Sequence, residues 1–271
     1  MNSKGTILVI GSSADSLTLK DGKREHAGYY LNEMVIPPRT ALDAGYEMVL
    51  ATPNGKRPVM DPQSAVASYF GGSGDALQKA LDFVESYPAM QSPISIRSAI
   101  NQGLDKYVAV YVPGGHPPMV DLMDNADLGE VLRHFHDMSK LTTLLCHGPV
   151  AMTAALPKAK EFRAALVRGD EEQARKLAAG WIYSGYRMTI FSNDEEHWVE
   201  DTYMQGRKVP FYVNDALRIA GGKVEISDQG IFKSHVVQDR ELITGQNPPS
   251  DQALAALFLQ ALDRSASRIA A

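Results

Sequence analysis

Short stretches of apolar and β-branched residues, each followed by a turn, constrain the fold of this 271-residue chain most strongly. Residues 6–10, 107–112 and 141–145 are the clearest of these stretches, and glycine lies in or just after the turn that follows each. They lack the strict alternation that marks a strand with one face in water. Such stretches are typical of strands buried on both faces, as in a parallel sheet with helices on either side.

Stretches with helical periodicity separate the predicted strands, and this alternation favours an α/β fold with a mostly parallel sheet. A helix over residues 27–44 is expected to break or restart at Pro37-Pro38, because proline removes a helical hydrogen bond. The remaining predicted strands are at residues 47–51, 187–191, 224–226, 236–237 and 242–243. The remaining predicted helices are at 75–86 (N-capped by Asp75), 126–138, 194–201, 211–220 and 250–264 (N-capped by Ser250), with a short helix of small residues that follows 146–149 and ends at 156.

The chain shows no internal repeat and no linker rich in glycine or serine, so we expect one domain over residues 1–271. Residues 158–179 are charged and carry only a thin apolar stripe at helical spacing. We interpret them as a helical segment inserted into this domain. Such a segment could cover the ligand site and change the size of the substrate, or it could form a contact between two copies of the chain.

Composition limits the partners that we expect. Lysine and arginine number 27 and aspartate and glutamate 32, a formal net charge of −5, so no basic surplus is available for a nucleic-acid backbone. No apolar stretch is long enough for a membrane span, and the N-terminal residues lack the features of a secretion signal. The single cysteine excludes an internal disulfide and a cysteine zinc cluster. These features predict a cytoplasmic protein without nucleic-acid or membrane partners.

That cysteine, Cys146, directly follows the predicted strand at 141–145 and precedes His147-Gly148-Pro149. Ligands of open α/β sheets bind at the carboxyl ends of the strands. A cysteine between a strand and a helix also lies at a helix N-terminus, which favours the thiolate. His147 is placed to take the proton of the thiol. We predict a nucleophile at Cys146, and the alternative interpretation is a buried structural thiol.

Four motifs occur together in this chain: residues 28–33 (GYYLNE), 113–116 (PGGH), 146–149 (CHGP) and 240–248 (RELITGQNP). Together they resemble the ThiJ/PfpI superfamily, and within it the heat-shock-protein branch that contains glyoxalase III. The resemblance implies a flavodoxin-like three-layer sandwich, with Glu33 beside the thiol of Cys146. The glutamate that pairs with the catalytic histidine of the family falls on Glu196. Asp194 and Glu195 compete for this role, because a slip of one residue changes the assignment.

The resemblance further implies a glutathione-independent glyoxalase, which converts methylglyoxal and related 2-oxoaldehydes to 2-hydroxy acids without a cofactor. The related removal of early glycation adducts is a second expected activity. In this chemistry Cys146 attacks the aldehyde to give a hemithioacetal, and His147 carries protons while Glu196 orients it. Glu33 is expected to be an uncharged carboxylic acid against the sulfur. The expected partners are a small aldehyde or glycated substrate and a second copy of the chain.

The loop between residues 113 and 116 is expected to complete the site. The backbone N–H groups of Gly115 and His147 are the expected oxyanion hole, and Gly114 and His116 are expected to line the pocket. His26, Glu33 and His116 also suit a metal site of two histidines and one carboxylate, but nothing in their spacing fixes that geometry, and we expect no metal.

Other functions are compatible with a reactive cysteine in this kind of fold. A stress-induced holdase chaperone would use exposed apolar surface, and a thiol redox sensor would use the reactivity of an accessible thiolate. A glutamine amidotransferase would place a His-x-Glu motif well after the cysteine, and the chain has none after Cys146. A cysteine peptidase would need an open cleft, which the inserted segment at 158–179 disfavours.

Overall fold

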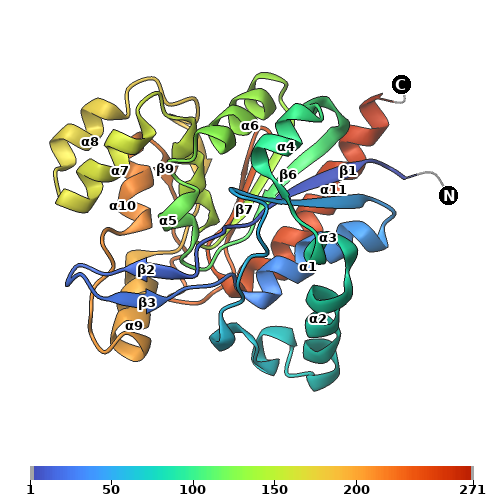
Figure 1. Cartoon of the computed structure of the whole chain (residues 1–271), viewed down its shortest axis with the longest axis horizontal. Helices are drawn as coiled ribbons and strands as arrows, with labels where there is room; N and C mark the ends of the chain where they lie inside the picture. Colours follow the sequence, from blue (N-terminus) through green and yellow to red (C-terminus); the bar gives the residue numbers. More distant parts are fainter. Residues whose placement is uncertain (1–2, 270–271) are drawn as a thin grey trace.

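A computed structural model describes residues 3–269 of the chain, and a seven-stranded sheet forms its centre (Figure 1). The strands of this sheet are β1 (Thr6–Ile10), β4 (Glu47–Thr52), β5 (Ile94–Ser95), β6 (Tyr107–Val112), β7 (Leu141–Leu145), β10 (Val236–Asp239) and β11 (Leu242–Gly245). Their order in space is β10-β11-β7-β6-β1-β4-β5, and every neighbouring pair is parallel except β10 with β11. The mostly parallel sheet expected from the apolar stretches is confirmed.

Helices cover both faces of this sheet. On one face α1 (Leu31–Asp43) packs on α11 (Asp251–Ile269), and on the other α6 (Ala126–Asp137) packs between α4 (Ile96–Asn101) and the 3₁₀-helix η4 (Gly148–Ala155). The other helices are α2 (Gly74–Ser86), α3 (Pro88–Gln91), α5 (Pro118–Asp121), α7 (Ala159–Arg168), α8 (Glu171–Leu177), α9 (Asn193–Tyr203), α10 (Val213–Ala220), η1 (Pro62–Ser64), η2 (Ala67–Phe70), η3 (Leu104–Lys106) and η5 (Pro248–Ser250). The three layers confirm the predicted sandwich.

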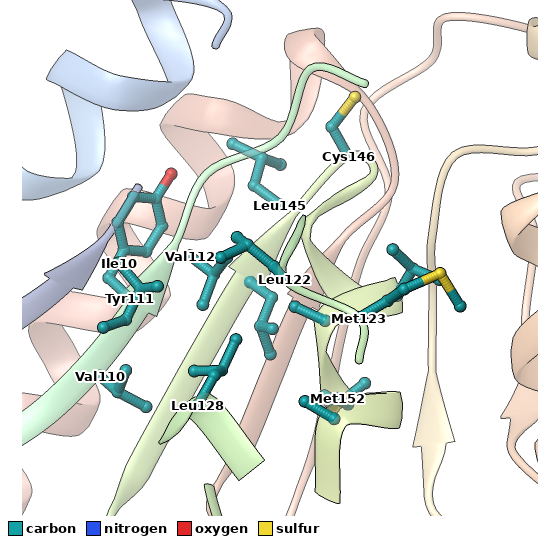
Figure 2. Packing of buried hydrophobic residues seen from close by; sticks show 14 of the residues in the cluster. Ile10, Val110, Tyr111, Val112, Leu122, Met123, Leu128, Leu145, Cys146 and Met152 are labelled. Atoms are coloured by element: carbon teal, nitrogen blue, oxygen red, sulfur yellow. The ribbon is translucent and has the colours of Figure 1, made fainter. Parts of the chain in front are cut away.

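The central strands are buried on both faces, as their apolar sequences predict. Figure 2 shows Val110, Tyr111 and Val112 on β6 beside Leu145 at the end of β7, with Cys146 beyond the last apolar layer. Because such strands bury both rows of side chains, they hold their carboxyl ends in fixed relative positions. Two smaller sheets lie outside this core, formed by β2 (Ser16–Thr18) with β3 (Arg24–His26) and by β8 (Arg187–Met188) with β9 (Lys223–Val224).

Helix α1 runs through Pro37-Pro38 without a break, so the predicted interruption is wrong. Proline 37 cannot donate to the carbonyl oxygen of Glu33, four residues earlier in the helix. The hydroxyl group of Tyr111, from β6, donates to that oxygen instead, at 2.6 Å. The buried carbonyl is therefore satisfied by the sheet, and the helix can continue.

Three other expectations need correction. The strand expected at 187–191 is only two residues long and pairs with β9 outside the main sheet, because the Thr189 N–H donates to the side chain of Thr244. The N-cap of α2 is Ser73, whose hydroxyl accepts from the Ala76 N–H, and Asp75 lies inside the first turn. The closing helix begins at Asp251, directly after the expected cap Ser250, but it extends to Ile269 and so ends beyond the expected residue 264.

The inserted segment at 158–179 forms α7 and α8, which pack on η4 and α10 at one edge of the molecule (Figure 1). Asp170 caps α8 by accepting from the Gln173 N–H, and Gly169 in the left-handed region ends α7. Among residues 3–269, no helix combines the length and the apolar character that crossing a membrane requires.

Candidate active site

Two loops at the carboxyl ends of β6 and β7 meet the start of α1 to form one buried site. This is the part of the sheet where the chain reverses its direction of growth, because β4 lies on one side of β1 and β6 on the other. Ligand sites of open α/β sheets form at such a switch point. The topology thus brings together Glu33, the loop after β6 and Cys146, although they lie far apart in the sequence.

The backbone of Cys146 is in the left-handed region, with φ of 60°, a conformation that residues other than glycine seldom adopt. Its N–H donates to the carbonyl of Gly245 at the end of β11, and its own carbonyl accepts from the N–H of Phe191. These two hydrogen bonds hold the turn, which brings the side chain to the end of β7. Strain of this kind is maintained where the surrounding structure fixes the chain on both sides.

Glu33 is fully buried on the first turn of α1, beside Cys146. Its Oε2 atom accepts the N–H of Gly114 at 2.8 Å, whereas Oε1 has no hydrogen-bond partner among the described residues. Burial raises the pKa of Glu33 to about 8, and the Gly114 N–H and the Cys146 side chain oppose this rise. At neutral pH the group is therefore largely an uncharged carboxylic acid.

A chain of polar contacts runs from Cys146 through two histidines. The sulfur lies 3.3 Å from Nδ1 of His147, and Nε2 of His147 lies 2.7 Å from Oε2 of Glu196. The other oxygen of Glu196 lies 2.8 Å from Nε2 of His116. Because the carboxylate can only accept, each histidine donates its Nε2–H to Glu196. Neutral His147 then presents the lone pair of Nδ1 to the thiol.

The pKa values of these groups are displaced in different directions. Burial acts to raise the pKa of Glu196, but the two imidazoles outweigh it and hold that pKa well below the usual range. Burial lowers the pKa of His147, with a further lowering from His116, and together these outweigh the attraction of Glu196. Glu196 is therefore a carboxylate at neutral pH, and His147 is a neutral base.

The thiolate expected at Cys146 is not the resting form, and this expectation is corrected. Burial raises the pKa of the thiol well above its ordinary value, and Glu33, once it is ionised at alkaline pH, raises it further, although the Gly115 N–H opposes them. The sulfur is nearly sealed, with the residue 2% exposed. A helix N-terminus stabilises a thiolate only modestly, which does not offset such desolvation. Cys146 is therefore a thiol at neutral pH, beside a neutral imidazole.

The structure brings Glu196 to His147 and separates its two competitors from the site. Asp194 is exposed at the start of α9. Glu195 is buried, but its carboxylate accepts from the side chains of Ser192, Gln246 and Asn247 and from the backbone of Phe232. The capping box that Ser192 and Glu195 form fixes the first turn of α9 and thereby the direction of Glu196.

The predicted loop residues take different places. The N–H of Gly114 is occupied by Glu33, and a side chain there would collide with Cβ of Cys146 at 2.6 Å. Gly114 does not line the pocket around the sulfur, whereas Gly115 and His116 do. Gly115 has φ of 78°, and a side chain there would lie 2.0 Å from the carbonyl of Gly28. Only glycine fits either position.

The three residues considered for a metal site are not assembled into one. Among the described residues, the histidine and carboxylate atoms close enough to share an ion are those of His116, His147 and Glu196, within 4.8 Å of one another. Both Nε2 atoms already bind the Glu196 carboxylate. We therefore assign this cluster to hydrogen bonding. His26 is exposed on β3 and lies outside it.

Aromatic side chains that the sequence analysis missed form the wall of the pocket over Cys146. Trp198 and Tyr203 come from α9, Tyr69 from η2, and Phe232 from the loop before β10. A signal was present, because Trp198 and Tyr203 follow Glu196 on the same helix, but helical spacing alone does not show which face meets a pocket. No residue of α7 or α8 lines this pocket, so the expectation that the inserted segment covers the site is wrong.

Comparison with known proteins agrees with this fold. The chain is 25% identical to the protein/nucleic acid deglycase HchA of Pseudomonas aeruginosa (strain UCBPP-PA14) over 261 residues, which is 94% of this chain and 80% of that protein. The HchA deglycase of Staphylococcus aureus (strain Newman) is 25% identical over 262 residues, with 94% and 78% covered.

Solved structures show the same fold at lower identity. Glyoxalase III from Candida albicans superposes with a TM-score of 0.71 at 20% identity, with 95% of this chain and 97% of that chain covered. The Rapid Encystment Protein of 24 kDa from Francisella tularensis gives a TM-score of 0.70 at 22% identity, with 95% and 99% covered.

The names of the two deglycases conflict with the expectation that nucleic acid is no partner. Net charge predicts whether a protein neutralises many phosphates, and it does not bear on the chemistry of an adduct on a base. The net charge of −5 therefore does not exclude nucleic acid as a partner. The model of the ThiJ/PfpI-like family matches residues 25–191, more than half of the chain, and the chain belongs to that family.

Proposed function

We propose that this protein is a glutathione-independent, glyoxalase III-like enzyme that converts small 2-oxoaldehydes to 2-hydroxy acids and acts on early glycation adducts. One observation carries the proposal: a buried thiol lies between a neutral imidazole paired with a carboxylate and an uncharged carboxylic acid. The names of the deglycase relatives support the second activity. No group besides the side chains and water is needed for this chemistry.

The reaction begins with addition of the thiol to the aldehyde. His147 takes the proton of Cys146 at Nδ1 as the sulfur bonds to the aldehyde carbon, and the new alkoxide receives that proton to give a hemithioacetal. Glu196 keeps Nε2 of His147 protonated, so that Nδ1 is the basic atom. The thiol need not be ionised at rest, because transfer and attack occur together.

Isomerisation and hydrolysis complete the reaction. A base removes the proton from the former aldehyde carbon, and a proton is delivered to the neighbouring carbon, which turns the hemithioacetal into a thioester. Glu33 suits this transfer because its pKa of about 8 allows it to take and give a proton near neutral pH. Water then cleaves the thioester and restores the thiol. Methylglyoxal and one water give lactate, with no net oxidation.

The pocket favours a small, uncharged substrate. The volume open to water centres above Cys146 is about 20 Å³, which is room for about one water. Its wall is mainly aromatic, and within the described part of the chain it contains neither lysine nor arginine. A carboxylate or phosphate on the substrate would find no lysine or arginine there, and the His116 imidazole in the wall is already bound to Glu196. The same small volume argues against a peptidase, which must admit an extended chain.

The test is lactate formation from methylglyoxal by the wild-type enzyme and by Cys146→Ala and Cys146→Ser. We expect both variants to lose at least about 1000-fold in kcat/KM, because the covalent route is removed. Circular dichroism and the unfolding midpoint establish that the variants are folded. Equal activity in wild type and variants would exclude the proposal. The homodimer and the cytoplasmic location stay predictions, to be checked by sedimentation and by cell fractionation.

A further inference from the structure

His116 was expected only to line the pocket, but the structure also binds it to Glu196. Its Nε2 atom and that of His147 bind opposite oxygens of the same carboxylate, at 2.8 and 2.7 Å. The two rings lie 4.4 Å apart between centroids. A carboxylate that orients one catalytic histidine usually has its second oxygen held by neutral donors. Here that oxygen faces an imidazole that can carry a charge.

We propose that His116 is a positioning residue that holds Glu196 from the side opposite His147 and neutralises its charge, so that His147 stays a neutral base. The inference rests on the proposed function only for its kinetic readout. It assigns different charge states to two histidines bound to one carboxylate, His116 as the cation and His147 as the base.

The surroundings of the two rings support this division. Glu196 and Glu200 of α9 and Asp61, which lies just before η1, face His116 together with His147. Burial acts to lower the pKa of His116, but these acidic groups outweigh it and raise the pKa above its ordinary value. The balance at His147 is the reverse. Burial and the charge of His116 lower the pKa of His147 by more than Glu196 raises it. Titratable pairs driven apart in this way mark an acid and a base.

Physical reasoning gives the consequence for catalysis. If Glu196 faced His147 alone, its whole charge would stabilise the imidazolium and raise the pKa of His147. A protonated His147 cannot take the proton of the Cys146 thiol. With His116 as counter-ion, Glu196 still fixes the tautomer of His147 by its hydrogen bond, but its electrostatic pull on the ring is reduced. With His116 in place, Glu196 therefore orients His147 without strongly stabilising the protonated form of His147.

The experiment measures the titration of the two rings by NMR of ¹⁵N-histidine-labelled protein, alongside the pH dependence of kcat/KM for methylglyoxal. In the wild type we expect His116 to titrate above His147. In His116→Gln, which keeps an N–H donor for Glu196 and removes the charge, we expect the midpoint of His147 to rise by roughly 1 pH unit. The acid limb of kcat/KM should move up by the same amount, so that activity falls roughly tenfold more at pH 6 than at pH 9.

His197→Gln is the matched control, because His197 neighbours Glu196 in sequence but is exposed and stacks edge-on against Tyr212. It should shift neither titration. A His147 midpoint that stays or falls in folded His116→Gln overturns the inference, as does a wild type in which His147 titrates above His116. The wild-type titration decides the matter if His116→Gln fails to fold. A wild type without lactate formation would refute the proposed function and leave the NMR test intact.

Discussion

At the scale of the residue, Cys146 shows how burial decides the protonation state of a thiol. The N–H of Gly115 favours a thiolate, yet the sulfur is almost inaccessible and lies against Glu33. Desolvation and a neighbouring acid have the larger effect. The site therefore keeps a thiol and a neutral imidazole in contact.

We expect Cys146 to react slowly with iodoacetamide at pH 7 and faster only as the pH rises above 9, because burial and Glu33 raise the pKa of the thiol well above its ordinary value. Mass spectrometry of the alkylated protein over pH 6 to 10 measures the rate. Urea-unfolded protein is the control and should titrate as an ordinary thiol. A plateau of fast alkylation already reached at pH 7 would contradict this assignment.

Glu33 should make the stability of the protein depend on pH. Its folded-state pKa of about 8 exceeds the ordinary 4.5, so the folded protein holds a proton that the unfolded chain has released across this window. Stability contributed by this group is complete below about pH 4.5 and is lost as the pH rises towards 8, by about 1.4 kcal/mol per pH unit. Glu33→Gln removes the titration and keeps an acceptor for the Gly114 N–H.

The measurement is the free energy of unfolding in urea at pH 5 and at pH 8 for wild type and Glu33→Gln. We expect the variant to gain stability relative to wild type between the two pH values. Glu47→Gln is the control, because Glu47 is exposed at the start of β4. A difference between Glu33→Gln and wild type that is the same at both pH values would refute the assigned pKa.

At the scale of the element, α1 is matched to the strand beneath it. Pro37 leaves the carbonyl of Glu33 without its helical donor, and the Tyr111 hydroxyl of β6 supplies one at 2.6 Å. The backbone of the helix is thus bound to the sheet at the residue whose side chain touches Cys146. The helical hydrogen bond that Pro37 removes is replaced by one that fixes the first turn of α1 to β6 beside the site.

Tyr111→Phe should lower the free energy of unfolding by about 1–3 kcal/mol and reduce kcat, because a buried carbonyl loses its donor and Glu33 loses an anchor. Tyr107→Phe on the same strand is the matched control, since the buried Tyr107 hydroxyl has no partner among the described residues. Adding Pro37→Ala to Tyr111→Phe supplies an N–H for the Glu33 carbonyl and should recover part of the stability. Urea unfolding and lactate kinetics measure both effects, and equal losses in the two tyrosine variants would contradict the link.

At the scale of the whole molecule, one apolar core joins the central sheet to both helical layers and to the inserted helices α7 and α8. We propose that the chain folds as a single unit. Thermal unfolding should then give one transition, with equal calorimetric and van't Hoff enthalpies. The fluorescence of Trp181, which follows α8, and that of Trp198 on α9 should change together, as Trp181→Phe and Trp198→Phe variants can show. An early, separate change at Trp181 would make the insertion an independent domain.

Most of the sheet and much of the site could be predicted from the sequence. Strands buried on both faces can be recognised in the sequence as apolar stretches. The turns after these strands place Cys146 and the loop at 113–116 near each other, because a parallel sheet brings the carboxyl ends of its strands to one edge. Glu33 and Glu196 entered through the family resemblance. The sequence left Glu196 in competition with Asp194 and Glu195, since neighbours in an acidic segment differ only in the direction in which the helix turns them.

The tertiary structure alone decided what depends on distance and on exclusion of water. It paired His116 with the free oxygen of Glu196, set the aromatic residues of α9, η2 and the loop before β10 over the sulfur, and moved the inserted helices away from the pocket. It also surrounded Cys146 with groups that raise the pKa of its thiol. Local sequence determines which element forms and which face is apolar. The protonation of a group depends on every charge and every desolvating atom around it, and folding brings these from distant parts of the chain.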